Sequence, residues 1–231
     1  MLKLVELDKL YNVVLWDLDG TIMDTNDSII QSVKHTLVSE NLPNLTYEQL
    51  QAFVGPPLED CFMKAFNCSM EDALKYSAVF RDHYKNKELF NAVPVEGVFD
   101  VMSIIKGLSI KQALATFKSE PFSIPLMMRF GFNKYFDSMH GSILGIKTTK
   151  VKLMQRCLVD LGESDYSKVV MIGDTEYDLL ASIELGCKFV GVNYGVGFKG
   201  ITDEERNNPN CIVFVDKITD ILPYIIKDYS K

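Results

Sequence analysis

Four short apolar runs recur along the chain, and each ends at a polar or glycine-rich turn. They lie at 13–16, 110–115, 169–172 and 189–192. Short and mostly apolar runs are typical of strands that are buried on both faces of a parallel sheet. The sequence therefore predicts four parallel strands in these stretches.

Apolar residues at helical spacing fill several of the stretches between these strands. Three such patterns lead to a glycine, which commonly ends a helix. They are Val98, Met102 and Ile105 before Gly107; Val151, Met154, Leu158 and Leu161 before Gly162; and Leu179 and Ile183 before Gly186. Because strands alternate with helices, we predict an α/β fold built on a doubly wound parallel sheet.

The stretch 24–94 breaks this alternation, because it contains helical patterns and no clear strand. The helical faces are Ile30, Val33 and Leu37; Leu58, Phe62 and Ala65; and Ala73, Tyr76, Phe80 and Tyr84. We predict a small all-helical domain at 24–94, inserted after the first strand. The α/β core domain would then consist of 1–23 and 95–231.

The overall charge is acidic. The chain of 231 residues has 24 Lys and Arg against 31 Asp and Glu, so the formal net charge is 24 − 31 = −7. No block of basic residues stands out, so we expect no nucleic-acid partner. An acidic protein that handles an anionic substrate needs local positive charge, such as a metal ion or a few well-placed lysines.

The cysteines and the N-terminus indicate a cytoplasmic protein. The five cysteines include no CxxC pair, which argues against a disulfide framework or a zinc site. The start of the chain lacks the apolar segment of a signal peptide, and no apolar run approaches membrane-spanning length. We therefore expect a cytoplasmic location, no membrane partner, and a monomer or weak dimer.

The first apolar run leads directly into two acids, Asp17 and Asp19. Alternate residues of an extended chain point the same way, so both carboxylates can face the edge where open α/β sheets bind ligands. Two carboxylates in such a place repel each other unless a cation lies between them. Mg²⁺ is the natural candidate, since it binds carboxylates together with substrate phosphate oxygens. Gly20 allows the sharp turn that follows.

A second acidic pair supports the same site. Asp174 follows the run at 169–172, and Asp178 comes four residues later. That spacing places both acids on one side of the chain as it enters a helix. Two strands that carry acids to one edge of a sheet predict a metal site. Its candidate ligands are Asp17, Asp19, Asp174 and Asp178.

Four motifs occur in an order that resembles a known family. They are DLDGT at 17–21, Thr116 after an apolar strand, a lysine near position 150, and GDTEYD at 173–178. The set resembles the signature motifs of the haloacid dehalogenase (HAD) superfamily over almost the whole chain. The sequences GFNKYFDSMHGS at 131–142 and FVGPPLED at 53–60 look most like the phosphoglycolate phosphatase-like branch. The resemblance implies a HAD-like Rossmannoid core with a helical cap.

The resemblance also implies a reaction, namely Mg²⁺-dependent hydrolysis of small phosphate monoesters through an aspartyl-phosphate. Asp17 would be the nucleophile, and Asp19 would act as general acid and then general base. The metal ion would lie between the Asp17 carboxylate, the Asp19 carbonyl and Asp174. Asp178 would orient the groups around the metal.

On the same resemblance, the second and third motifs supply the contacts to the phosphate. Thr116 would hydrogen bond a phosphoryl oxygen, and Lys150 would offset negative charge. Phe117 departs from the family pattern, because a small polar residue usually follows the threonine, although its backbone N–H could still bind phosphate. The lysine is ambiguous, since Lys147 and Lys152 are close by. We favour Lys150, because the apolar helix face begins directly after it, with Lys147 second.

Four further residues are expected to contact the substrate. Gly20 and Thr21 belong to the first motif, and Gly55 and Pro56 belong to a Gly-Pro-Pro sequence in the helical insert. On the residues alone this sequence is a stiff turn. On the resemblance it is a substrate-specificity loop that faces the catalytic edge.

Alternative functions remain within the same fold. A dehalogenase does not need the second acid, so Asp19 argues against it. A phosphosugar mutase would keep both aspartates, and a non-catalytic HAD-like binding protein would be expected to lose an acid. The substrate is open among phosphoglycolate, nucleoside monophosphates, sugar phosphates and pyrophosphate. A chain with only four arginines favours a monophosphate.

Overall fold

A six-stranded parallel sheet forms the centre of the molecule. The computed structural model describes residues 8–198, 201–227 and 229. The strand order is β5-β4-β1-β6-β7-β8, and every neighbouring pair is parallel. The chain adds β4 and β5 on one side of β1 and then crosses over to add β6, β7 and β8 on the other. The strands are β1 (Val13–Trp16), β4 (Lys111–Ser119), β5 (Ser138–Ser142), β6 (Val169–Gly173), β7 (Lys188–Val192) and β8 (Cys211–Val215).

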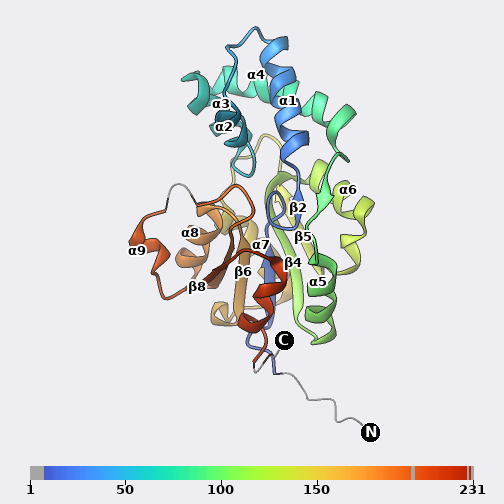
Figure 1. The fold of residues 1–231 in the computed structure, drawn as a ribbon, viewed down its shortest axis with the longest axis vertical. Coiled ribbons are helices and arrows are strands. Elements are labelled where there is room, and N and C mark those ends of the chain that lie inside the picture. The colour runs from blue at the N-terminus through green and yellow to red at the C-terminus, as the bar shows by residue number, and fades with distance from the viewer. Residues whose placement is uncertain (1–7, 199–200, 228, 230–231) are drawn as a thin grey trace.

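Helices cover both faces of this sheet (Figure 1). On one face lie α5 (Val98–Gly107), α6 (Glu120–Phe130) and the 3₁₀ helix η4 (Ile218–Tyr224), which pack on Val14 and Trp16 of β1. On the other face lie α7 (Lys150–Leu161) and α8 (Glu176–Leu185), which pack on Val13 and Leu15. Alternate side chains of β1 therefore belong to two hydrophobic cores, one on each face of the sheet. The predicted doubly wound α/β fold is confirmed.

The helical insert lies beyond the C-terminal ends of the strands (Figure 1). Its helices enclose a core of their own, in which Phe62, Phe80 and Tyr84 are buried. Two short antiparallel strands, β2 (Met23–Asp24) and β3 (Val93–Pro94), pair at the point where the chain leaves and re-enters the sheet. The helices are α1 (Asn26–Ser39), α2 (Tyr47–Gln51), α3 (Leu58–Phe66), α4 (Met70–His83) and the π-helix η1 (Tyr84–Glu88).

Several elements differ from the sequence prediction. The strand expected at 110–115 continues to Ser119, with a register shift against β5 after Ala115. Strand β5, with the sequence SMHGS, has no apolar run and gave no signal. Helix α6 contains two prolines, one of them in its interior, which hide its helical pattern. The short helices α9 (Asp203–Arg206), η2 (Phe132–Lys134) and η3 (Tyr166–Lys168) complete the fold.

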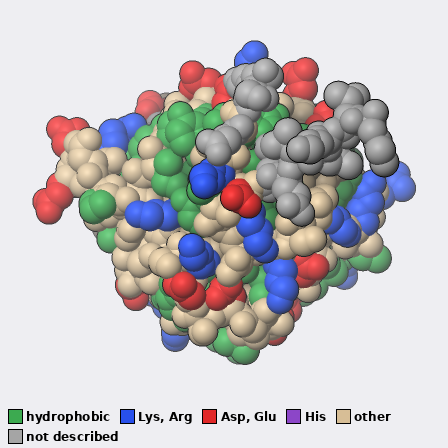
Figure 2. Space-filling model, turned by 90° about the horizontal axis from the view of Figure 1, so that it is seen from below, with side chains coloured by type: hydrophobic (Ala, Val, Ile, Leu, Met, Phe, Trp, Pro, Cys, Tyr) green, Lys and Arg blue, Asp and Glu red, His purple; other side chains and the backbone are tan. Residues whose placement is uncertain are grey.

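The surface opposite the insert carries charges of both signs. Figure 2 shows this face, where basic and acidic side chains are interspersed. Within the described ranges, no helix combines the length and the apolar character that crossing a membrane requires. All five cysteines are free thiols.

Candidate active site

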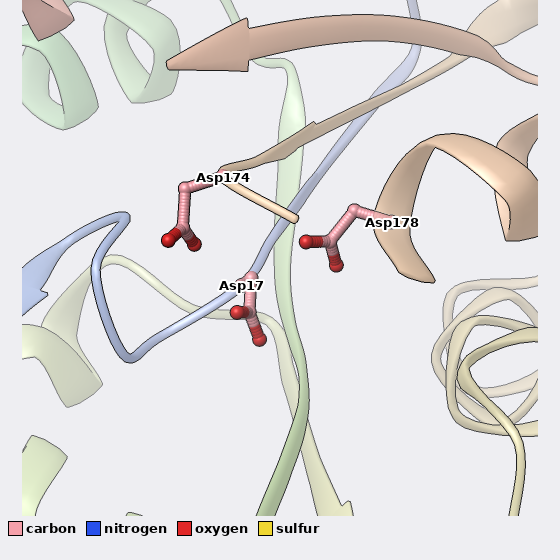
Figure 3. A group of neighbouring side chains, drawn as sticks. All are labelled: Asp17, Asp174 and Asp178. Carbon is pink, nitrogen blue, oxygen red and sulfur yellow. The ribbon is translucent and has the colours of Figure 1, made fainter. Parts of the chain in front are cut away.

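The ends of β1 and β6 bring three aspartates together. Asp17 follows β1 directly, Asp174 follows β6, and Asp178 lies in the first turn of α8. The Asp17 backbone N–H donates to the Ile172 carbonyl at 3.0 Å, which fixes the two strand ends to each other. One carboxylate oxygen from each acid lies within 4.8 Å of the others. Figure 3 shows the three side chains close together, with Asp174 and Asp178 on either side of Asp17.

This meeting point is a consequence of the sheet topology. The order β5-β4-β1-β6-β7-β8 reverses direction between β1 and β6. In open α/β sheets the crevice at such a switch point, outside the carboxyl ends of the strands, is where ligands bind. The two acids predicted to share an edge therefore lie at the position where the fold leaves room for a ligand.

Two glycines allow the backbone to close around Asp174. Gly20 has a φ of +82°, and a Cβ on it would lie 2.3 Å from Asp174 Oδ2. A Cβ on Gly195 would lie 2.2 Å from the same oxygen. Asp174 in turn accepts hydrogen bonds from Thr21 Oγ1 at 2.8 Å and from the Val196 backbone N–H at 2.7 Å. The first motif thus supports the fourth motif across the site.

Lys150 is the cation of this cluster. It begins α7, and Thr149 caps that helix by accepting from the Lys152 backbone N–H. Lys150 Nζ donates to Asp17 Oδ1 at 2.7 Å and to the Ala115 carbonyl at 3.0 Å, and it lies 2.8 Å from Asp178 Oδ1. Lys147 and Lys152 are exposed. Of the three candidate lysines, only Lys150 reaches the aspartates.

Burial makes the negative charge of this cluster costly. Burial raises the pKa of Asp17 to about 7, against the attraction of Lys150, and the charges of Asp178 and Asp19 raise it further. Burial and the neighbouring Asp17 and Asp178 likewise raise the pKa of Asp174 well above its usual value. Burial disfavours the charged form of Lys150, but the two carboxylates it contacts raise its pKa overall. The single ammonium of Lys150 therefore lies in a cluster with three carboxylates.

The arrangement fits a hard divalent cation. The donor set consists only of carboxylate oxygens, which are the ligands that Mg²⁺ prefers. Asp178 Oδ1 is fully buried, and the ammonium of Lys150, which also contacts Asp17, lies 2.8 Å from it. One ammonium beside three buried carboxylates leaves negative charge uncompensated, which suits a divalent metal ion. Asp17, Asp174 and Asp178 could therefore hold such an ion.

The side chain of Asp19 lies outside this group of three. Its Oδ1 accepts from Thr25 Oγ1 at 2.7 Å and from Lys118 Nζ at 2.8 Å. Lys118 is itself buried, and its Nζ lies 4.7 Å from the centroid of the Tyr84 ring of the insert. Burial disfavours its charged form, but Asp19 and Tyr84 raise its pKa overall. Asp19 is thus held by an ion pair next to the insert.

Lys118 is not among the site residues predicted from the sequence. A usable signal was present, because Lys118 lies two residues after Thr116 on an extended strand, and such residues share a side. The Lys118 backbone N–H also donates to Thr116 Oγ1 at 3.2 Å. Thr116 is buried on β4.

Phe117 covers the buried lysine. Lys150 Nζ lies 5.2 Å from the Phe117 ring centroid, within the range of a cation–π contact. The ring also packs edge-to-face on Tyr177 at 5.4 Å. The residue that departs from the family pattern therefore places an aromatic ring against the ammonium of Lys150.

A cavity of about 350 Å³ lies between the insert and the sheet domain. It is bordered by Asp19 and Lys118 from the sheet domain and by Gly55 and Pro56 from the insert. Gly55 has a φ of +98°, and a Cβ on it would lie 3.3 Å from Thr175 Cγ2. The Gly-Pro-Pro turn therefore lies close to the catalytic edge.

Comparisons with known proteins agree with this geometry. A family model described as haloacid dehalogenase-like hydrolase matches residues 14–192. A 5′-nucleotidase of Pseudomonas aeruginosa is 30% identical over 190 residues, covering 81% of this chain and 85% of the relative. A phosphoglycolate phosphatase of Agrobacterium fabrum is 25% identical over 190 residues, covering 79% and 81%.

A solved structure gives the same result. The crystal structure of a predicted phosphatase from Clostridium acetobutylicum superposes with a TM-score of 0.83 at 32% identity. The match covers 92% of this chain and 96% of that one. The chain belongs to the haloacid dehalogenase-like hydrolase family, and it is a phosphatase.

Proposed function

We propose that this phosphatase hydrolyses small phosphate monoesters with Mg²⁺, through an aspartyl-phosphate on Asp17. One observation carries the proposal. The buried Asp17 carboxylate accepts a hydrogen bond from Lys150, and it has an oxygen within 4.8 Å of carboxylate oxygens of Asp174 and Asp178. The names of the relatives support a phosphorylated small molecule as substrate.

Asp17, Asp174 and Asp178 would hold the metal ion. When bound, Mg²⁺ supplies the positive charge that lets an anionic phosphate approach an anionic nucleophile. Lys150 adds to that charge from the protein side, because its ammonium is already 2.7 Å from Asp17 Oδ1. Thr116 Oγ1 and the backbone N–H of Phe117 are the proposed phosphate donors. The backbone N–H groups of Gly20 and Thr21, which the sequence also suggested, already donate to the Met23 and Leu18 carbonyls.

In the first step an Asp17 carboxylate oxygen attacks phosphorus. A bond forms between that oxygen and phosphorus, and the bond from phosphorus to the leaving oxygen breaks. Asp19 enters this step in its acid form, with the proton on Oδ2, and donates that proton to the leaving oxygen, so that the product departs as a neutral alcohol. Lys118 and Thr25 hold Asp19 Oδ1, which leaves Oδ2 for the proton transfer.

In the second step Asp19 takes a proton from water. The water oxygen attacks phosphorus of the aspartyl-phosphate, the bond to Asp17 breaks, and inorganic phosphate leaves. Asp17 returns to its carboxylate and Asp19 to its acid, so the cycle closes. Phe117 limits the access of other water to the ion pair between Asp17 and Lys150.

The proposed division of the chain gives the insert a role as a lid. The core would consist of 1–23 and 95–231, and the cap of 24–94. The paired strands β2 and β3 join the two parts, so a change of backbone angles there would move the cap as a unit. The Gly-Pro-Pro turn at 55–57 would then close over bound substrate.

The test is hydrolysis of a panel of phosphate monoesters by wild type and Asp17→Asn, with Mg²⁺ and with EDTA. We expect metal-dependent release of phosphate that Asp17→Asn lowers by roughly 10³-fold or more, with circular dichroism unchanged. Full activity in Asp17→Asn would exclude Asp17 as nucleophile. Turnover that moves phosphate within a sugar, without release, would indicate a mutase. Binding without turnover would indicate a non-catalytic protein.

A further inference from the structure

The cavity between cap and core lies on the side of the leaving group. Asp19 borders the cavity, whereas Asp17, Asp174 and Asp178 do not. In the proposed reaction Asp19 protonates the leaving oxygen, so the alcohol part of the substrate must extend past Asp19. If the proposed function holds, the side chains that line this cavity therefore contact the alcohol part of the substrate and determine which alcohol fits.

Apolar side chains are exposed on two opposite rims of the cavity. Met70 and Leu74 of α4 are 42% and 47% exposed, and both line it from the cap. Ile143, Leu144 and Ile146 follow β5, are 45%, 44% and 60% exposed, and line it from the core. Large apolar side chains that face one cavity from two elements are typical of a binding site for an apolar group.

Aromatic rings form a further part of the wall. Phe80 and Phe122 line the cavity and are almost fully buried. Tyr84 lies between them, stacked on Phe80 at 5.7 Å and edge-to-face with Phe122 at 5.6 Å. These contacts fix the rings in place, so they offer a preorganised surface for a flat ring.

Two cations that line the cavity, the buried Lys118 and the partly buried Arg81, already have partners. Lys118 pairs with Asp19 at 2.8 Å, and Arg81 of α4 pairs with Glu59 of α3 at 2.6 Å. Asp60 adds a negative charge to the lining. Among the described lining residues, Lys147 is the remaining cation, and it is exposed at the rim. A second anionic group on the substrate would meet no unpaired buried cation, and its desolvation would not be offset.

We infer that the substrate is a phosphate monoester whose alcohol is uncharged, bears a flat ring and is of nucleoside size. The cavity volume of about 350 Å³ falls in the range that accepts ligands of this kind. The neutral pair of Arg81 and Glu59 offers hydrogen bonds to the polar edge of a ring without net charge. Phosphoglycolate and pyrophosphate carry a second anion and leave the apolar rims uncovered, so both fit poorly.

A matched pair of substrates tests the inference. Adenosine 5′-monophosphate and ribose 5-phosphate share the phosphate, the ester carbon and the leaving oxygen, and differ in the base. We expect kcat/KM with Mg²⁺ to be roughly tenfold or more higher for the nucleotide, because the base covers apolar wall. We expect phosphoglycolate and pyrophosphate to be poorer than the nucleotide. An equal or higher kcat/KM for ribose 5-phosphate, phosphoglycolate or pyrophosphate would overturn the inference.

Substitutions at the rim of the cavity test whether the preference for the nucleotide arises there. Leu144→Asp places a charge where the base is expected, so the nucleotide-to-ribose ratio should fall roughly fivefold or more. Val159→Asp is the matched control, because Val159 is an exposed apolar residue of α7 that does not line the cavity. It should leave the ratio unchanged. A ratio that Leu144→Asp does not lower would count against the inference, and Leu74→Asp repeats the test if Leu144→Asp fails to fold.

A binding measurement separates this inference from the proposed reaction. Calorimetry with Asp17→Asn compares adenosine with ribose, neither of which carries phosphate. Adenosine should bind measurably tighter, and equal binding would overturn the inference. Tighter adenosine binding with no hydrolysis of any ester by wild type would support the inference while contradicting the proposed function. Hydrolysis without preference for the ring would do the opposite.

Discussion

Among the single residues of the site, two buried lysines pair with different aspartates. Lys150 neutralises part of the charge on Asp17 and Asp178, and Lys118 holds Asp19. Each lysine is almost completely withdrawn from water, where an ion pair is strong but the loss of one partner is costly. Their removal should therefore have effects that exposed lysines nearby do not share.

The first prediction concerns the identity of the third-motif lysine. Lys150→Ala removes the counter-charge of two buried carboxylates, so kcat should fall by roughly 100-fold or more. Lys147→Ala removes an exposed side chain and should be far less damaging. Steady-state kinetics with Mg²⁺ on both variants decide the matter. The reverse order would assign the role to Lys147.

The second prediction concerns Lys118 as a positioning residue. Lys118→Met keeps the length of the side chain but removes the donor to Asp19 Oδ1, so kcat should fall by about 10–100-fold. Lys118→Arg should restore part of the activity, because it returns a cationic donor beside Asp19. A Lys118→Met variant with unchanged kcat would contradict the assignment.

Much of the residue-level site could be predicted from the sequence. Asp17, Asp174 and Asp178 could be predicted because acids at strand ends have few structural reasons to be there. Lys118 was missed because a lysine in a strand is usually interpreted as a surface residue unless its ion-pair partner is known. Of the cavity wall, Gly55 and Pro56 were predicted to face the catalytic edge, and they line the cavity. The apolar rims could not be predicted, since Met70 and Ile143 lie far apart in the sequence and meet only when the cap is placed.

At the scale of elements, the site depends on how the loops close against strand ends. The turn after β1 passes so close to Asp174 that only a glycine fits at position 20. Four strands could be predicted because they are central and apolar. Strand β5 could not, because its hydrogen bonds to β4 and not its own side chains place it in the sheet.

The third prediction uses this close approach. Gly20→Ala adds a Cβ 2.3 Å from Asp174 Oδ2 at a φ of +82°, so Asp174 must move. Activity should fall by roughly 10²-fold or more, because small displacements of catalytic groups are costly. Gly131→Ala is the control, since Gly131 has a φ of +78° and nothing within 4 Å of the added Cβ.

Comparison of the two variants isolates the clash. Both should lose about 1–2 kcal/mol of unfolding free energy in urea from the left-handed backbone conformation. Gly20→Ala should lose more than Gly131→Ala, because its Cβ also displaces the buried Asp174. Only Gly20→Ala should also lose activity. Equal activity in the two variants would show that the contact with Asp174 does not matter for function.

At the scale of the whole molecule, metal binding and stability should be linked through pH. The metal-free fold must bury Asp17, whose pKa rises from 3.8 to about 7. A carboxyl group with a raised pKa binds its proton more tightly in the folded state, so ionising it opposes folding. Its contribution to stability is therefore lost as pH rises from about 4 to about 7.

The fourth prediction follows from this loss of stability with rising pH. Mg²⁺ binds the ionised carboxylates, so its stabilising effect should be larger at about pH 8 than at about pH 5.5. Thermal unfolding with Mg²⁺ and with EDTA at both pH values measures the difference in Tm. NaCl at matched ionic strength controls for general screening. An equal shift at both pH values would contradict the carboxylate cluster as the metal site.

In the proposed reaction Asp17 carries the phosphoryl group during turnover. To test this step, the enzyme is mixed with a radioactively labelled phosphate monoester and Mg²⁺, the reaction is quenched with acid within the first turnover, and the label is mapped. We expect a label on the peptide that contains Asp17, released by hydroxylamine as expected of an acyl phosphate, and absent from Asp17→Asn. Turnover without a covalent label, or a label that persists in Asp17→Asn, would contradict the proposed reaction.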